Sequence, residues 1–163
     1  MSSERFRVTC VCTGNICRSP MAERVLEQAL ERAGLADRVI VDSAGTMGWH
    51  EGNGAHANTV AVLDEAGYRG DGHSARQLSD ELFKSADLIL LMDRGHRQDL
   101  RSVGLTEGTE VHLWRSFDPH ARASGQLDIP DPWGYDEPTY RETLALLEAA
   151  VPEIIELIRE RVL

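Results

Sequence analysis

The pattern of hydrophobic residues changes period at the end of a short N-terminal strand. Residues 5–11 read Arg-Phe-Arg-Val-Thr-Cys-Val, a β-branched alternating run that predicts a strand. Residues 19–33 instead carry apolar side chains at helical spacing, with Ser19 as the expected N-cap and Gly34 directly behind. The chain therefore opens with a strand, a tight loop and a helix.

The alternation of predicted strands and helices continues to the C-terminus. Further strands are predicted at residues 38–44, 87–92 and 110–113, and further helices at 58–66, 79–85, 94–100 and from 138 onward. Residues 87–92 read Asp-Leu-Ile-Leu-Leu-Met, an apolar run typical of a strand buried on both faces. Pro152 interrupts the last helical pattern, so we expect a kink or a restart there.

This order of elements predicts an α/β fold with a single domain, residues 1–163. Strands that alternate with helices are typical of an open parallel sheet, here of about four strands, with helices on both faces. The length of 163 residues agrees with one domain of about 150. Two stretches, 45–57 and 116–135, hold no predicted element, and loops this long in a compact domain usually carry function.

Composition and charge narrow the classes of function. The chain has 17 basic and 27 acidic residues, a net charge of -10, which opposes general attraction to nucleic acid or anionic lipid. No apolar run approaches the ~18 residues of a membrane span, and residues 1–5 lack the apolar stretch of a signal peptide. We therefore expect a cytoplasmic protein with no nucleic-acid or membrane partner, in which any anion site is local.

Cysteine and histidine usage argues against both disulfides and metal. Cys10, Cys12 and Cys17 lie within eight residues, a spacing that cannot serve as the disulfide framework of a secreted fold. The six histidines show no metal-binding spacing such as HExxH, and none lies near the three cysteines in sequence. We expect a reducing compartment, no metal site and no cofactor.

The segment between the first strand and the first helix is the most informative part of the chain. Residues 12–18 read Cys-Thr-Gly-Asn-Ile-Cys-Arg, and the helix that follows offers unsatisfied N–H groups and the positive end of its dipole to an anion. Such a loop can curl with its N–H groups inward around a tetrahedral oxyanion, with Gly14 and Asn15 suited to positive φ. Arg18 would close the loop with two parallel hydrogen bonds.

Cys12 at the floor of this loop points to phosphoryl transfer. The helix dipole, the loop amides and Arg18 all favour its thiolate form, and a thiolate aimed at a bound phosphate suggests a cysteinyl-phosphate intermediate. The reaction needs an acid for the leaving group and later a base that activates water. Asp131 and Asp128 both lie in the Pro-rich stretch that would reach the pocket, and the residues alone favour neither strongly.

Two loop tryptophans are candidates for the wall of a substrate slot. Trp49 and Trp133 lie outside the periodic segments, so they would either grip an aromatic ring or remain exposed or half-packed on their loops.

Residues 11–23, Val-Cys-Thr-Gly-Asn-Ile-Cys-Arg-Ser-Pro-Met-Ala-Glu, resemble the signature of the low molecular weight protein tyrosine phosphatase family. Further matching segments follow in the family's order along nearly the whole chain, at residues 42–46, 49–50, 73–76, 92–93, 116–119 and 131–132. The resemblance implies Cys12 as nucleophile, Arg18 as phosphate clamp and Asp131 as general acid. The phosphate-binding loop would comprise Thr13, Gly14, Asn15, Ile16, Cys17, Arg18 and Ser19.

The same resemblance implies supporting roles. The residues expected to hold the loop through hydrogen bonds are Asn15, Ser19, Ser43 and His73, and Ser19 would also help to stabilise the thiolate. Cys17 would be a redox partner of Cys12, and the alternative is that Cys17 only fills space beneath the loop. The family often has two adjacent tyrosines after Asp-Pro, whereas this chain has Trp-Gly-Tyr at 133–135, so regulation through a tyrosine pair is not carried over.

Two other functions fit parts of the pattern. Arsenate reductases of the same fold have a similar Cys-x5-Arg loop but use further cysteines downstream, and this chain has none after Cys17. A non-catalytic phosphotyrosine-binding module would need neither Cys12 nor Asp131. The sequence therefore predicts a metal-independent protein-tyrosine phosphatase, a monomer that acts on phosphotyrosine-containing proteins or small aryl phosphates.

Overall fold

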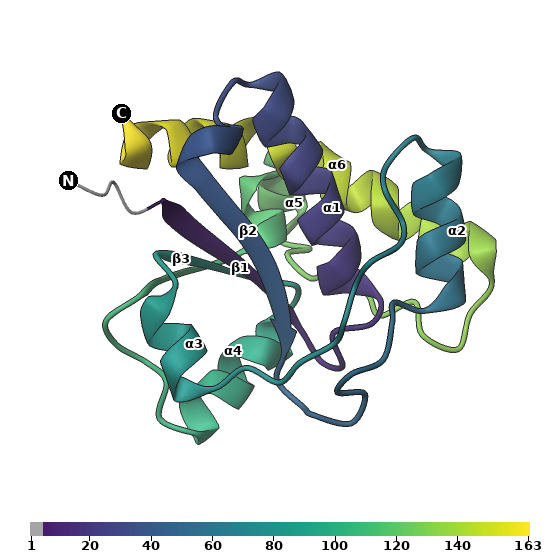
Figure 1. Cartoon of the computed structure of the whole chain (residues 1–163), viewed down its shortest axis with the longest axis horizontal. Helices are drawn as coiled ribbons and strands as arrows, with labels where there is room; N and C mark the ends of the chain where they lie inside the picture. Colours follow the sequence, from purple (N-terminus) through teal and green to yellow (C-terminus); the bar gives the residue numbers. More distant parts are fainter. Residues whose placement is uncertain (1–4) are drawn as a thin grey trace.

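One sheet of four parallel strands forms the centre of the described chain (Figure 1). The computed structural model describes residues 5–163. The strands are β1 (Phe6–Cys12), β2 (Val39–Gly45), β3 (Leu88–Leu91) and β4 (Glu110–Leu113), in the order β2-β1-β3-β4. Residues 1–4, on which the expectation about a signal peptide depends, lie outside the described part. The predicted α/β fold with an open parallel sheet is confirmed.

Helices cover both faces of this sheet, as predicted. They are α1 (Arg18–Arg32), α2 (Ala57–Glu65), α3 (Asp80–Ser85), α4 (Arg94–Ser102), α5 (Pro119–Ser124) and α6 (Glu137–Val162), with 3-10 helices η1 (Ala36–Arg38) and η2 (Trp114–Phe117). Figure 1 shows α1, α2 and α6 on one side of the sheet and α3 and α4 on the other. Leu88 and Leu90 face the apolar cluster under α1 and α6, whereas Ile89 and Leu91 face the cluster under α3 and α4. This two-sided burial explains why the strand is apolar at every position.

The long C-terminal helix does not restart at Pro152, so that half of the expected kink or restart is wrong. α6 continues through this proline to Val162. A proline inside a helix removes one hydrogen bond of the ladder. Leu147 and Ala150 before it and Ile154 after it are all fully buried, and their packing stabilises the helix on both sides of the proline.

The stretch 116–135 contains more regular structure than its composition indicates. It includes the end of η2 and the six-residue helix α5. Asp118 caps α5, since its side chain accepts a hydrogen bond from the backbone N–H of His120 at 2.9 Å, and Pro119 occupies the first turn. A helix of this length is too short for hydrophobic periodicity to indicate it.

The carboxyl ends of β1, β2 and β3 meet at one end of the sheet, where the loops that follow them form the site. Gly45 ends β2 there, and an added Cβ would lie 2.5 Å from the carbonyl oxygen of Thr13, so only glycine fits. At the opposite end of the sheet, NH1 of Arg38 donates to the carbonyl oxygen of Val162 at 3.1 Å. None of the helices within residues 5–163 is long and apolar enough to cross a membrane.

Candidate active site

The loop between β1 and α1 bends sharply at Asn15. Asn15 has φ 58°, in the left-handed region that asparagine tolerates better than most residues. Gly14 does not share this conformation, so the expectation of positive φ is wrong for it. An added Cβ on Gly14 would lie 3.0 Å from Cδ2 of His50, so glycine at this position leaves room for the neighbouring loop.

Asn15 is fully buried, and its side chain ties the loop to β2 and to the segment after α2. Its Oδ1 accepts from the backbone N–H of Arg76 at 3.0 Å. Its Nδ2 donates to Oγ of Ser19 at 2.8 Å and to Oγ of Ser43 at 2.9 Å. Nε2 of His73 lies 2.6 Å from the carbonyl oxygen of Asn15. The structure thus brings the four residues expected to support the loop into one hydrogen-bonded cluster.

Two partly buried ionisable groups, His73 and Glu23, complete this cluster. Burial lowers the pKa of His73 below its ordinary value, so the ring is neutral at pH 7 and its Nε2–H donates to the carbonyl of Asn15. Ser43 donates to Oε1 of Glu23 at 2.6 Å, and burial raises the pKa of Glu23. The loop is therefore fixed in shape by its own chain before a ligand arrives.

The first helix begins at Arg18, two residues earlier than an N-cap at Ser19 implies, so Ser19 is not its N-cap. The N-cap is Cys17, which makes no side-chain capping bond. Oγ of Ser19 lies instead 3.0 Å from Sγ of Cys12. This oxygen accepts from Nδ2 of Asn15, and its own proton is available to a thiolate at the sulfur. The first N–H groups of α1 lie beside the loop, where they suit an anion.

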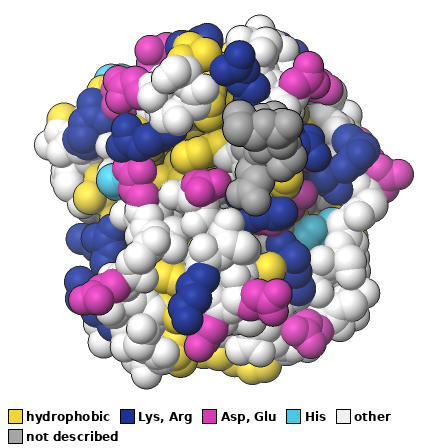
Figure 2. Space-filling view, turned by 60° about the vertical axis from the view of Figure 1, so that its left-hand side comes forward, with side chains coloured by type: hydrophobic (Ala, Val, Ile, Leu, Met, Phe, Trp, Pro, Cys, Tyr) yellow, Lys and Arg dark blue, Asp and Glu magenta, His cyan; other side chains and the backbone are white. Residues whose placement is uncertain are grey.

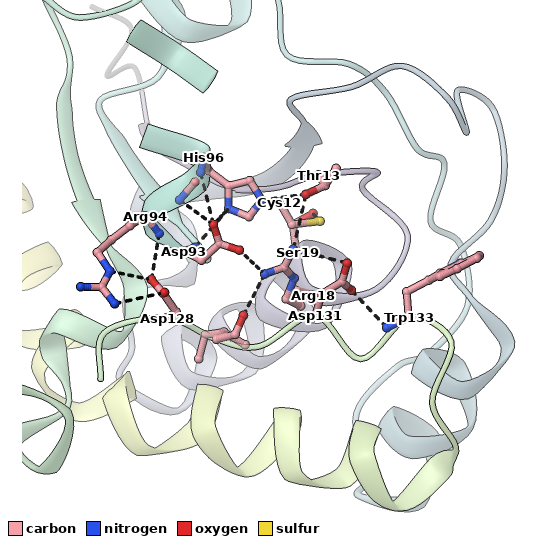
Figure 3. A network of polar contacts seen from close by, with 12 residues as sticks. Cys12, Thr13, Arg18, Ser19, Asp93, Arg94, His96, Asp128, Asp131 and Trp133 are labelled. Atoms are coloured by element: carbon pink, nitrogen blue, oxygen red, sulfur yellow. Dashed lines mark hydrogen bonds and ion pairs between the residues drawn. The ribbon is translucent and has the colours of Figure 1, made fainter. Parts of the chain in front are cut away.

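The guanidinium of Arg18 is buried and is held along one edge by protein acceptors (Figure 3). Its NH1 donates to Oδ2 of Asp93 at 2.6 Å and to the carbonyl oxygen of Ile129 at 2.8 Å. Its NH2 lies 3.4 Å from Oγ1 of Thr13 and 3.8 Å from Oδ2 of Asp131. Since NH1 is engaged twice, the edge formed by Nε and NH2 is the one suited to a bidentate anion.

The two candidate acids have different surroundings, and Asp131 alone of the pair lines the cavity with Cys12. Oδ1 of Asp131 accepts from the backbone N–H of Trp133 at 3.1 Å. Asp128 is instead paired with Arg94, whose backbone N–H and Nε donate to it at 2.9 and 3.2 Å. Figure 3 shows Asp131 turned toward Arg18 and Asp128 turned toward Arg94.

Two exposed tryptophans border the cavity above the loop. Trp49 is 72% exposed and Trp133 is 60% exposed, and both line a cavity of about 220 Å³ together with Cys12 and Asp131. The remaining lining residues are Thr13, Gly14, Ile16, Cys17, Arg18 and His50. A thiol, a guanidinium, a carboxylate and two aromatic walls therefore converge from separate parts of the chain.

The family described as low molecular weight phosphotyrosine protein phosphatase matches residues 7–162. The chain belongs to this family. A low molecular weight protein-tyrosine-phosphatase of Streptomyces coelicolor is 48% identical over 159 residues, which are 96% of each chain. Low molecular weight protein-tyrosine phosphatase A of Mycobacterium tuberculosis is 43% identical, over 98% of this chain and 95% of its own. The crystal structure of YfkJ from Bacillus subtilis has a TM-score of 0.87 at 31% identity and covers 99% of both chains. The predicted protein-tyrosine phosphatase activity is confirmed.

The three cysteines of the phosphatase are free and buried. Cys10 lies within β1, and burial raises its pKa well above the usual range. Burial also raises the pKa of Cys17 to about 11, and its sulfur lies 3.4 Å from the hydroxyl of Tyr140. Neither Cys10 nor Cys17 is therefore ionised near neutral pH.

Three residues that contact the loop of the phosphatase were not given a role there by the sequence. The sequence places Asp93 directly before the predicted helix at 94–100, and leaves His96 and Arg76 without a function. In the structure Asp93 binds Arg18, His96 contacts Thr13, and Arg76 binds Asn15 while its Nε donates to the carbonyl of Ser43 at 3.1 Å. In the sequence, Arg76 and Asp93 were indicated only by the match of residues 73–76 and 92–93 to the family. Such a match marks positions but does not show which residues they contact.

The surface of the phosphatase mixes charges of both signs. On the face shown in Figure 2, acidic and basic side chains are interspersed. Within residues 5–163 no three His, Cys, Asp or Glu side chains gather as metal ligands would. The donors around Cys12 are thus a local feature of a chain whose net charge is -10.

Proposed function

We propose that the phosphatase hydrolyses phosphotyrosine through a cysteinyl-phosphate on Cys12, without a metal ion. The observation that carries this proposal is the cavity that Cys12, Arg18 and Asp131 share. A nucleophile, an anion clamp and an acid are the groups that phosphoryl transfer from an aryl ester requires. Trp49 and Trp133 add apolar walls that suit the phenyl ring of the substrate.

The phosphate of the substrate binds in the curl of residues 13–19. Backbone N–H groups of the loop and of the start of α1 surround its oxygens, and the Nε and NH2 edge of Arg18 donates two parallel hydrogen bonds. The charge on its three nonbridging oxygens is thereby balanced by the guanidinium and the N–H dipoles, without a metal ion. The loop does not need to reorganise, because Asn15 and its partners already hold it.

In the first step Sγ of Cys12 attacks phosphorus, and the bond to the phenolic oxygen breaks as the sulfur–phosphorus bond forms. The leaving oxygen takes the proton of Asp131, which acts as general acid. The hydroxyl of Ser19, 3.0 Å from the sulfur, stabilises the thiolate before the attack.

In the second step water hydrolyses the intermediate. The carboxylate of Asp131 takes a proton from water while the water oxygen attacks phosphorus, and the sulfur–phosphorus bond breaks. The sulfur leaves as a thiolate, which Ser19 again stabilises, and phosphate is released. Asp131 ends the cycle protonated and ready for the next substrate.

Hydrolysis of a phosphotyrosine peptide in the presence of a metal chelator tests this proposal. Cys12→Ser is expected to lose essentially all turnover and still bind inorganic phosphate, whereas Cys10→Ala, a matched change of a buried cysteine outside the cavity, retains activity. A phosphoserine peptide, which lacks the ring, should be a poor substrate. Full activity of Cys12→Ser, or an absolute need for a divalent metal, contradicts the mechanism.

Cys17 is proposed as the redox partner of the nucleophile. Both sulfurs belong to residues that line the same cavity, which supports their approach. Peroxide oxidises the Cys12 thiolate to a sulfenic acid, the Cys17 thiol attacks that sulfur, a disulfide forms and water leaves. Because burial raises the pKa of Cys17, only a small fraction of this thiol is ionised near neutral pH, and we expect the disulfide to form slowly.

The phosphatase is further proposed to act as a single-domain monomer in the cytoplasm, on phosphotyrosine-containing proteins or small aryl phosphates. The family match over residues 7–162 supports one domain, and three free buried thiols support a reducing compartment. Sedimentation of the purified protein and cell fractionation test these two points. A stable dimer or a secreted product would contradict them.

A further inference from the structure

The two ring nitrogens of His96 have different partners behind the loop. His96 is 1% exposed, and its Nδ1 accepts from the backbone N–H of Asp93 at 3.1 Å. Its Nε2 lies 2.9 Å from Oγ1 of Thr13. Burial, together with the positive charge of Arg18, lowers the pKa of His96 to about 4, although the Asp93 carboxylate lies 3.4 Å from Nδ1 and opposes this. The ring is therefore neutral, with its proton on Nε2.

The hydroxyl oxygen of Thr13 consequently accepts two hydrogen bonds. One comes from Nε2–H of His96, and the other comes from NH2 of Arg18 at 3.4 Å. A hydroxyl has two lone pairs and one proton, so with both lone pairs engaged the proton of Thr13 must be donated elsewhere. Thr13 lines the cavity that holds Cys12, and an acceptor bound there would meet this proton.

We propose that the Thr13 hydroxyl donates a hydrogen bond to a nonbridging oxygen of the bound phosphoryl group, and that His96 is the positioning residue that aims it. The proposal rests on the proposed function, because the acceptor belongs to the phosphoryl group of substrate, intermediate and product. A backbone N–H of the loop has a fixed direction, whereas a hydroxyl rotates unless its lone pairs are held. His96 supplies that restraint and makes Thr13 a preorganised donor.

Inorganic phosphate, measured as a competitive inhibitor of phosphotyrosine hydrolysis, is the probe for this contact. Thr13→Val keeps the branched shape and removes the hydroxyl, so phosphate inhibition is expected to weaken by about tenfold or more, the usual effect of losing a hydrogen bond to a charged group. Thr13→Ser restores the hydroxyl and is expected to recover most of the loss. Thr106→Val, the same change at an exposed position outside the cavity, serves as control.

Substitutions of His96 test the positioning role. His96→Gln can place an N–H close to the position of Nε2 and should retain more phosphate affinity than His96→Phe, which has no donor. When Thr13→Val is also present, changing His96 should alter phosphate affinity no further, because the hydroxyl it aims is gone. A residue with only a structural role would instead give additive losses.

The outcomes separate this contact from the mechanism it serves. If phosphate inhibits the active Thr13→Val enzyme as strongly as it inhibits the unmodified chain, the inference is overturned and the proposed function stands. Additive losses of phosphate affinity from the Thr13 and His96 substitutions have the same meaning. If the His96→Phe protein does not fold, as judged by circular dichroism, the comparison of Thr13→Val with Thr13→Ser decides. Failure of the proposed function is a different result: the unmodified chain would not hydrolyse phosphotyrosine.

Discussion

Oδ2 of Asp93 lies 2.6 Å from NH1 of Arg18 and joins the loop after β3 to the loop after β1. The other carboxylate oxygen of Asp93 caps α4 by accepting from the backbone N–H of Gly95 at 2.8 Å. Burial alone would raise the pKa of Asp93, but Arg18 and His96 outweigh it and hold this pKa below its usual value. One carboxylate thus anchors a helix with one oxygen and the anion clamp with the other.

Substitution of Asp93 separates these two tasks. Asp93→Asn keeps an oxygen for the cap but loses the charge that holds Arg18, so KM and the inhibition constant of phosphate are expected to rise about tenfold. Asp93→Ala loses the cap as well and should cost about 1 kcal/mol more in the free energy of unfolding. Steady-state kinetics and urea denaturation measure the two effects. Unchanged kinetics for Asp93→Asn would mean that Asp93 serves only the helix.

Asp131 is expected to matter most for poor leaving groups. Asp131→Asn cannot donate a proton, so hydrolysis of phosphotyrosine should slow by about 10²-fold, and hydrolysis of an aryl phosphate with an acidic phenol should slow less. Asp128→Asn is the matched control and should have a small effect, since Asp128 is paired with Arg94. The comparison of kcat for both substrates checks this. A larger loss in Asp128→Asn would move the acid to that residue.

His96 makes stability depend on pH. The pKa of a histidine in the unfolded chain is about 6.5, whereas in the folded chain that of His96 is about 4, so the unfolded state binds more protons between these values. The stability that accompanies a neutral His96 is present above pH ~6.5 and is lost as the pH falls toward 4, by roughly 3 kcal/mol.

His96→Gln, which does not titrate, provides the reference for this effect. Urea denaturation of both proteins from neutral to acidic pH should show a steeper decline for the unmodified chain. Parallel declines of the two free energies of unfolding would mean that His96 binds its proton equally well in the folded and unfolded states.

Oxidation by mild peroxide should be reversible through Cys17. The unmodified phosphatase is expected to regain activity with a dithiol and to yield a peptide pair joined through Cys12 and Cys17. Cys17→Ser cannot form this bond and should lose activity irreversibly as the sulfur oxidises further. Cys10→Ala should behave like the unmodified chain, because Cys10 lies outside the cavity. Equal recovery of Cys17→Ser would leave Cys17 as a packing residue.

The local features of the fold were predictable because they are carried by contiguous residues. The alternation in 5–11 and the helical spacing in 19–33 specify β1 and α1 within one residue or two at each end. Ser19 was misread because Ser before a helical pattern usually caps it, whereas here Asn15 and Cys12 compete for its hydroxyl. A tertiary contact overrode a local preference.

The contacts that complete the site were not predictable from spacing. Arg18 meets Asp93, Asn15 meets the backbone of Arg76, and Thr13 meets His96 only because parallel strands bring their carboxyl ends together. A sequence indicates that loops will meet at this edge but not which side chains will face each other. The choice between Asp131 and Asp128 has the same origin, since their environments differ only after the chain folds.

A phosphoryl group on Cys12 during turnover is the most direct sign of the proposed reaction. Rapid quenching in alkaline denaturant during turnover of an activated aryl phosphate preserves the sulfur–phosphorus bond, and peptide mass spectrometry then detects it. Asp131→Asn should accumulate the intermediate, because the first step needs little acid with this substrate while the second lacks its base. We expect one phosphoryl group on the peptide that contains Cys12, and none in Cys12→Ala. Continued turnover with no phosphoryl group on Cys12, or with one on another residue, would contradict the mechanism.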